Sequence, residues 1–280
     1  MPTPSPFAPT LLPLAREFPF TDADFDRVRA FIRERAGISL AETKKDMVYG
    51  RLVRRVRALG LGSFNAYLTL LFSAAGRPEL EFFVNALTTN LTFFFREEHH
   101  FPLLAEHLRQ KSGDITIWCA ASSTGEEPYT IAMTAHEATQ GRSHTRVSIV
   151  ATDLDTHVLA TAAAGCYAET AIARLPVGLA TRHFDRQPDG TWKIRPELRQ
   201  MVRFQPLNLV EPNWALRGPF DAIFCRNVMI YFDRDTQLAI LRRFAPLLKP
   251  DGLLFVGHSE NFYHAADLFK LRGKTVYEKV

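Results

Sequence analysis

The sequence predicts an α/β fold with a largely parallel sheet, preceded by a domain built of helices alone. From Asp114 onward, short apolar runs rich in β-forming residues alternate with segments of helical periodicity. Strands that alternate with helices in this way are typical of a parallel sheet covered on both faces. Before that point, the apolar residues recur at helical spacing, which indicates a separate helical domain.

The helical domain is expected to contain four helices. The first begins at Thr21, which forms a capping-box pattern with Asp24, and it ends at Gly37. The second helix spans about 43–59, with an apolar stripe that includes Val48 and Leu52. Two shorter helices follow, over 64–72 and 80–87.

The second of these helices is strongly basic. Between Lys44 and Arg57 there are six basic residues and one acid, a local excess larger than the net charge of +4 of the whole chain. Lys44, Arg51 and Arg55 lie together on one face, flanked by Arg54, because seven and eleven residues are close to whole helical turns. Such a cluster usually faces either water or an anionic partner.

The second half of the chain predicts the sheet. Its expected strands cover 115–121, 146–153, 220–227, 252–260 and 274–280, and its expected helices open near Glu126, run from Thr156 to about Ala164, and run from Asp233 to Leu248. Residues 166–205 interrupt the alternation. There the turn signal Pro188-Asp189-Gly190 separates two strand-like pieces, which predicts a small antiparallel insertion.

Open α/β sheets bind ligands beyond the carboxyl ends of their strands. After the first strand, Ser122–Glu127 contains one glycine and no GK[ST] ending, so it is neither a dinucleotide turn nor a phosphate-binding loop. Two glutamates at a helix start would repel a phosphate and would suit a ligand with a cationic end. Capping of the helix is the alternative role for one of them.

Two further strand ends carry polar residues. Asp153 follows the second strand, where nucleotide-binding folds place an acid that contacts ribose, while Asp155 or Thr156 fits the role of helix cap. Arg226 and Asn227 follow the third strand, where they either line a pocket or form a turn. For the nearby Tyr231 a role in the core is equally open.

The segment 88–97 precedes the sheet. Asn90 and Thr92 are candidate helix caps, and three phenylalanines that follow are candidate core residues. Arg96 comes directly after the phenylalanines, and a guanidinium beside an apolar cluster is expected to seek a carboxylate partner.

Composition excludes several other classes of protein. The three cysteines are too few and too scattered for a disulfide framework or a zinc site, and no apolar run is long enough to span a membrane. His99, His100 and His107 lack metal-ligand spacing, so we expect solvated helix positions and no metal. The proline-rich residues 1–17 predict a disordered leader without a secretory signal, which favours a cytoplasmic protein.

Several segments together resemble a known family, the CheR chemotaxis receptor methyltransferases. They are TTNLTFFFRE, HHFPLLAEHL, WCAASSTGEEPY, ATDLD and FDAIFCRNVMIYFD, in this order, and the resemblance covers nearly the whole chain from about Phe18. It implies a Rossmann-like fold that binds S-adenosylmethionine, in three parts: a leader over 1–17, a helical substrate-docking domain over 18–88, and a methyltransferase domain over 89–280 with the β-insertion at about 166–205.

The resemblance also implies an activity and a set of site residues. Members of the family move the methyl group of S-adenosylmethionine to glutamate side chains of methyl-accepting chemotaxis receptors, leaving S-adenosylhomocysteine, without a metal. Arg96 and Tyr231 would be catalytic. The residues expected at the cofactor are Asn90, Thr92, Arg96, Glu127, Asp153, Asn208, Leu209, Arg226 and Asn227.

The expected partner is the helical cytoplasmic domain of a receptor. Lys44, Arg51, Arg54 and Arg55 would dock along its acidic surface, and the protein would act as a monomer without inserting into the membrane. The compact turn Gln187–Thr191 speaks against an additional grip on a receptor peptide by the insertion. A nucleic-acid methyltransferase is the rival enzyme, but it would typically carry a stacking motif where this chain has Cys-Arg-Asn-Val. A non-catalytic adaptor is the other rival.

Overall fold

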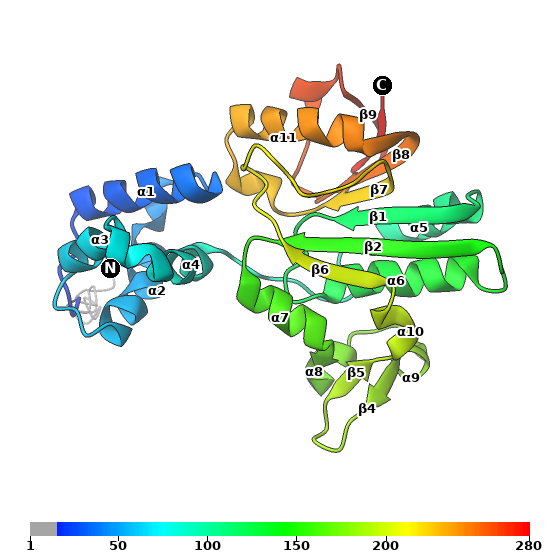
Figure 1. Cartoon of the computed structure of the whole chain (residues 1–280), viewed down its shortest axis with the longest axis horizontal. Coiled ribbons are helices and arrows are strands. Elements are labelled where there is room, and N and C mark those ends of the chain that lie inside the picture. The colour runs from blue at the N-terminus through cyan, green and yellow to red at the C-terminus, as the bar shows by residue number, and fades with distance from the viewer. Residues whose placement is uncertain (1–15) are drawn as a thin grey trace, which may run out of the picture.

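The structure, a computed structural model, describes residues 16–280, so nearly all of the expected leader 1–17 lies outside the described residues. A helical domain stands beside a larger α/β domain, and a small β-insertion projects from the latter (Figure 1). The main sheet and the helical front part confirm the predicted fold class. No helix within 16–280 is long and apolar enough to cross a membrane.

Four α-helices build the helical domain, as the apolar spacing predicts. They are α1 (Asp22–Ala36), α2 (Lys45–Ala58), α3 (Phe64–Leu71) and α4 (Arg77–Leu87), with short 3-10 turns at Glu42–Lys44 and Ala74–Gly76. The capping box of Thr21 and Asp24 forms at the start of α1, and Gly37 ends this helix in the left-handed conformation. One apolar cluster, which includes Val28, Ile32, Leu52 and Phe64, holds the helices together.

Two arginines of the basic helix α2 bind other parts of the same domain. Arg55 forms a bidentate ion pair with the buried Glu79 of α4, at 2.8 and 2.7 Å, and the Tyr67 hydroxyl donates to the same carboxylate at 3.0 Å. Arg51 donates to the carbonyl oxygens of Leu87 and Thr88, at 3.0 and 2.7 Å. Arg51 thus satisfies carbonyls that the end of α4 leaves without helical partners.

The basic face of α2 therefore differs from the sequence expectation. The sequence predicts that Arg51 and Arg55 face water or a partner, whereas both hold α4 against α2. Lys44 and Arg54 remain exposed, while Arg51 and Arg55 are half-buried, and docking of a receptor by these four side chains stays a prediction.

The α/β domain is built on a seven-stranded sheet in the order β6-β2-β1-β7-β8-β10-β9. The parallel strands are β1 (Gly113–Cys119), β2 (Thr145–Asp153), β6 (Val202–Pro206), β7 (Phe220–Cys225) and β8 (Leu248–Val256). An antiparallel hairpin of β9 (Phe269–Gly273) and β10 (Val276–Lys279) completes the sheet beside β8. The strand β9 has no counterpart among the predicted strands.

Helices cover both faces of this sheet (Figure 1). One apolar cluster joins the sheet to α5 (His100–Arg109) and α6 (Glu126–Thr139), and a second cluster joins it to α11 (Arg234–Leu247). Helix α7 (Thr156–Ala164) follows β2. Because parallel strands are buried on both faces, β7 is apolar apart from Asp221 and buried along its whole length.

The β-insertion is a separate three-stranded antiparallel sheet in the order β3-β5-β4. Its strands are β3 (Cys166–Tyr167), β4 (Phe184–Arg186) and β5 (Trp192–Ile194). The short helices α8 (Glu169–Ile172) and α9 (Leu179–His183) lie between β3 and β4, and α10 (Pro196–Arg199) leads from β5 to β6. The predicted turn lies between β4 and β5, where Gly190 has a φ of 84°. Strand β6, which the sequence assigns to the insertion, pairs instead with β2 of the main sheet. Apolar and polar residues alternate along β6 because it lies at the edge of the main sheet, and the same alternation is typical of a strand in a hairpin.

Two histidines that the sequence places in solvent are buried. His107 contacts the carbonyl oxygen of Asp221, and the His100 ring contacts the Thr275 hydroxyl at 2.9 Å and the Lys274 carbonyl at 3.1 Å. Helix α5 therefore packs His100 against the turn of the β9–β10 hairpin and His107 against β7. Burial, helped by the nearby charge of Arg226 and by His99, lowers the pKa of His100 to about 3.

His100 should make the stability of the protein depend on pH. In the unfolded chain a histidine has a pKa of about 6.5, so between that pH and about 3 the unfolded state binds a proton that the folded state does not. Stability therefore falls as the pH falls through this window. The variant His100→Gln keeps a polar side chain that does not titrate. Between pH 7 and pH 5 we therefore expect its free energy of unfolding to fall by about 2 kcal/mol less than that of the wild type.

Urea unfolding of both proteins at the two pH values measures this difference. Titrating groups that do not contact His100 cancel in the comparison. Parallel pH dependence of the wild type and the variant would show that His100 is not the group responsible.

Candidate functional site

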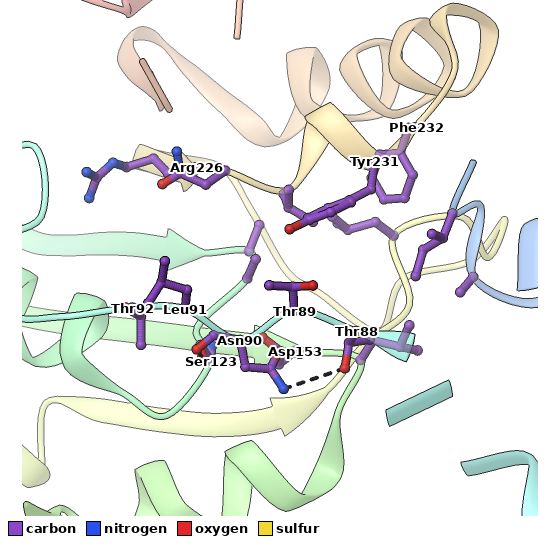
Figure 2. Close-up of a pocket in the computed structure, with 18 of the residues that line it drawn as sticks. Thr88, Thr89, Asn90, Leu91, Thr92, Ser123, Asp153, Arg226, Tyr231 and Phe232 are labelled. Carbon is purple, nitrogen blue, oxygen red and sulfur yellow. Dashed lines mark hydrogen bonds between the residues drawn. The ribbon is translucent and has the colours of Figure 1, made fainter. Parts of the chain in front are cut away.

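A pocket lies where the helical domain meets the carboxyl ends of β1, β2 and β7. It surrounds about 910 Å³, part of which is open to solvent, and the helical domain contributes Ala36, Ile38 and Leu87 to its wall. The segment 88–92, which links the two domains, crosses it (Figure 2). Every residue that the sequence predicts at the cofactor or in catalysis lines this pocket: Asn90, Thr92, Arg96, Glu127, Asp153, Asn208, Leu209, Arg226, Asn227 and Tyr231.

The side chain of Arg226 lies at the base of the site and is completely buried. Its guanidinium contacts Glu127 Oε2 at 2.6 Å and Glu97 Oε2 at 3.3 Å, and it also donates to the carbonyl oxygen of Arg96. These partners come from the first turn of α6 and from the turn that precedes α5. A buried charge is tolerated only when it is paired in this way.

The charges of this cluster favour a cationic ligand. Burial raises the pKa of Glu127, and the Arg226 guanidinium opposes that rise. For Glu97, burial also acts to raise the pKa, but the His258 N–H, the Arg226 charge and the Asn227 amide together hold it below its ordinary value. With both carboxylates ionised, Glu97, Glu127 and Arg226 carry a net charge of −1, and Arg96 places a further positive charge in the lining of the pocket.

The structure separates the two glutamates at the start of α6. Glu127 lines the pocket, whereas Glu126 accepts a hydrogen bond from the Thr124 hydroxyl at 2.6 Å and does not line it. Gly125, directly before them, has a φ of 99° that favours glycine. After this turn, the side chain of Glu126 points away from the pocket and that of Glu127 points into it.

The two aspartates after β2 also have different roles. Asp155 caps α7 by accepting from the backbone N–H groups of His157 and Val158, and Asn90 donates to it at 2.9 Å. Asp153 lines the pocket and accepts from the backbone N–H groups of Ser123 and Asp155, at 2.8 and 3.0 Å. Burial raises the pKa of Asp153, against the effect of these N–H groups. Figure 2 shows Asn90, Ser123 and Asp153 together on one side of the pocket.

Arg96 differs from its expected environment. Its guanidinium donates to the carbonyl oxygen of Leu91 at 2.7 Å, and within residues 16–280 no carboxylate lies within salt-bridge distance of it. The sequence predicts a carboxylate partner, which this part of the chain does not supply. Arg96 therefore presents a cation that a carboxylate of a bound molecule can use.

Tyr231 and Asn208 complete the wall nearest to the helical domain. Tyr231 ends a 3-10 turn, Met229–Tyr231, and its hydroxyl points into the pocket (Figure 2). Its backbone carbonyl accepts from the Ser39 N–H at 2.7 Å. The Asn208 side chain donates to the carbonyl oxygen of Arg35 at 2.8 Å, which joins the pocket to the end of α1. Tyr231 thus lines the pocket and also packs against the apolar cluster of the helical domain, so both roles open for it have a place in the structure.

Two acidic residues of the site carry no role in the sequence prediction. Glu260 is buried after β8, and its carboxylate accepts from the backbone N–H groups of Asn227, Met229 and Gly257, at 3.0, 2.8 and 2.5 Å. Glu97 accepts from the Asn227 side chain and the His258 N–H. The available signal was the position of Glu260 just beyond an apolar strand.

No cluster of three or more His, Cys, Asp or Glu that could hold a metal is found in residues 16–280.

Glu260 should position the pocket residues that follow β7. Glu260→Gln replaces one acceptor oxygen by a donor that faces backbone N–H groups, so the loop should shift. We expect about a tenfold weaker binding of S-adenosylhomocysteine, equivalent to about 1.4 kcal/mol. Isothermal titration calorimetry measures this, with Glu211→Gln, at an exposed position, as the control. Wild-type affinity of a folded Glu260→Gln variant would contradict this role.

Comparisons with known proteins agree with this geometry. Two family descriptions match the chain: "CheR methyltransferase, all-alpha domain" over residues 23–88 and "CheR methyltransferase, SAM binding domain" over residues 90–278.

Curated relatives match along nearly their full length. The chemotaxis protein methyltransferase of Escherichia coli (strain K12) is 53% identical, over 95% of this chain and 94% of that protein. The one from Salmonella typhimurium is 51% identical, over 98% of this chain and 96% of that protein. Chemotaxis protein methyltransferase 2 of Pseudomonas aeruginosa is 51% identical, over 94% of this chain and 95% of that protein. The chain therefore belongs to the CheR methyltransferase family, whose S-adenosylmethionine-binding domain contributes most of the residues that line the pocket described above.

Proposed function

We propose that this protein transfers the methyl group of S-adenosylmethionine to glutamate carboxylates of methyl-accepting chemotaxis receptors, forming glutamate methyl esters. The observation that carries the proposal is the composition of the pocket. Acidic side chains, Glu127 and Asp153, line it together with Arg96, a guanidinium that has no carboxylate partner in residues 16–280. A carboxylate acceptor and a cationic donor need this combination of charges.

The residues of the pocket fit the proposed cofactor. Glu127, at the negatively charged base, is suited to the ammonium group of the methionine part. Asp153, at the end of β2, is suited to the ribose hydroxyls. Asn208 and Leu209 would offer an amide and an apolar surface to the adenine. Asn90 and Thr92 would line the wall of the pocket beside the cofactor.

The chemistry requires alignment more than activation. Bound S-adenosylmethionine would supply a sulfonium methyl, so that the S–CH₃ bond breaks as an acceptor oxygen forms the O–CH₃ bond with its own electron pair, and a neutral thioether leaves. The acceptor glutamate is ionised at neutral pH and needs no general base. What the chain must contribute is orientation of the acceptor and exclusion of water.

Two side chains are placed for that orientation. The guanidinium of Arg96, which has no carboxylate partner within residues 16–280, would bind either the acceptor carboxylate or the carboxylate of the cofactor, and the Tyr231 hydroxyl points into the same space. Ala36, Ile38 and Leu87 of the helical domain form an apolar wall against solvent. The helical domain would thus shield from water the side of the pocket at which a receptor binds.

Methyl transfer to a receptor tests the proposal directly. The protein is incubated with methyl-labelled S-adenosylmethionine and the purified cytoplasmic domain of a chemotaxis receptor. We expect label that alkali releases, as from a methyl ester, and peptide mass spectrometry that places it on glutamate. Alkali-stable label, or label on nucleic acid and not on receptor, would contradict the proposal.

Arg96 is the residue whose loss should affect transfer most. We expect Arg96→Ala to lower receptor methylation at least about 100-fold, as for the loss of one charged group that acts at the reacting centre. Initial rates measure this, with the exposed Arg217 changed to Ala as the control.

Calorimetry on the same variant separates the two roles of Arg96. Weaker binding of S-adenosylhomocysteine would assign Arg96 to the cofactor, and unchanged binding would assign it to the acceptor. Undiminished methylation by Arg96→Ala would refute both roles.

A further inference from the structure

A closed ring of hydrogen bonds lies on the side of the pocket where β1 and β2 end. It joins the segment between the two domains to the loops that follow these strands, and its members are Asn90, Ser123, Asp153 and Asp155. Asn90, Ser123 and Asp153 line the pocket, and Figure 2 shows them together. Asp155 is buried and closes the ring from outside the pocket lining.

Each member of the ring is held by two neighbours. The Asn90 side-chain amide donates to Asp155 Oδ2 at 2.9 Å, and the Asn90 carbonyl oxygen accepts from the Ser123 hydroxyl at 3.1 Å. The Ser123 N–H donates to Asp153 Oδ2 at 2.8 Å, and the Asp155 N–H donates to Asp153 Oδ1 at 3.0 Å. The position of Asn90 in the pocket wall therefore depends on the carboxylate of Asp155.

The chemistry of Asp155 also fixes the orientation of the Asn90 amide. An ionised carboxylate only accepts hydrogen bonds, so the amide must turn its NH₂ group toward Asp155. The same NH₂ group reaches the Thr88 hydroxyl at 3.5 Å (Figure 2). Asn90 Oδ1 is therefore the end of the amide left for another partner, and within residues 16–280 it accepts no hydrogen bond.

The two oxygens of Asp155 have different partners. Oδ1 accepts from the backbone N–H groups of His157 and Val158, at 2.9 and 3.3 Å, and so caps α7. Oδ2 binds the Asn90 amide. Because the two contacts use different atoms, a substitution can keep the cap and change only what Asn90 meets.

We infer that Asp155 is a positioning residue for the cofactor, although it does not line the pocket itself. It turns Asn90 Oδ1 toward the pocket, where this oxygen accepts a hydrogen bond from a donor group of the bound cofactor. It also holds the segment 88–92 against the ends of β1 and β2. The inference rests on the proposed function for the identity of the ligand.

The variant Asp155→Asn tests the orientation of the amide. Asparagine caps a helix about as well as aspartate does, so the midpoint of thermal unfolding should stay near that of the wild type. The new amide at position 155 would offer an NH₂ group to Asn90, whose own amide would then flip and present NH₂ to the pocket. We expect about tenfold weaker binding of S-adenosylhomocysteine in isothermal titration calorimetry. The control is Asp235→Asn, which removes the same charge from an exposed position in the first turn of α11 and should keep the affinity unchanged.

Exchange of the two side chains provides the second arm of the test. Asn90→Asp alone places two carboxylates against each other, and their repulsion should weaken binding further than Asp155→Asn does. In the double variant Asn90→Asp, Asp155→Asn, the amide at position 155 donates to the carboxylate at position 90, and an oxygen again faces the pocket. We expect this double variant to bind S-adenosylhomocysteine about tenfold more tightly than Asn90→Asp. A role in stability alone would not produce such a recovery of affinity.

Two results overturn the inference. One is an unchanged Kd in a folded Asp155→Asn variant, and the other is a double variant that binds no better than Asn90→Asp. If Asp155→Asn does not fold, Asp155→Ser keeps a hydroxyl that caps α7 and leaves no second oxygen for Asn90. That variant should also bind S-adenosylhomocysteine more weakly, and an unchanged Kd there would equally overturn the inference.

Calorimetry without turnover keeps this inference apart from the proposed function. A wild-type protein that binds S-adenosylhomocysteine and methylates no receptor glutamate contradicts the proposed function. The affinities of the variants at positions 90 and 155 still decide the role of Asp155 in that case.

Discussion

The geometry of the site depends on the burial of a single charge. Arg226 has no contact with solvent, so its guanidinium is stable only while carboxylates stay next to it. Those carboxylates, Glu127 and Glu97, lie at the start of α6 and in the turn before α5. The strand β7, the helix α6 and the segment 88–97 are therefore held in one arrangement, and the pocket is the space that this arrangement leaves.

The backbone is strained beside this buried pair. Phe95, Glu97 and Asn227 have positive φ angles between 53° and 58°, which non-glycine residues rarely adopt. Glu97 and Asn227 contact each other, and Glu260 holds the backbone of Asn227 by accepting its N–H. Gly257 allows this close approach, because a Cβ there would lie 2.8 Å from the backbone nitrogen of Asn227. The surrounding hydrogen bonds thus hold Asn227, which lines the pocket, and its neighbour Glu97 in conformations that they would not keep alone.

Local patterns in the sequence were sufficient for most elements and for the polar residues at the strand ends, whereas other pocket residues, such as Asn208 and Leu209, followed only from the family resemblance. The capping box at Thr21 and the polar residues at strand ends are local signals, and the structure contains both. Contacts between residues that are distant in the sequence leave no local pattern and were not predicted. Strand β6 joins the main sheet and not the insertion, and Arg55 pairs with Glu79, a residue 24 positions away. Glu260 and Glu97 were missed for the same reason, since their partners are backbone groups of distant loops.

The most direct test of this account is a double-mutant cycle on Arg226 and Glu127, with the Kd of S-adenosylhomocysteine as the measured quantity. The variants are Arg226→Gln, Glu127→Gln and the double variant. Because each single change disrupts the same buried pair, the account predicts that both weaken binding and that the double variant loses clearly less than the sum of the two. Losses that simply add, or wild-type affinity in either single variant, would contradict the dependence of the pocket on this pair.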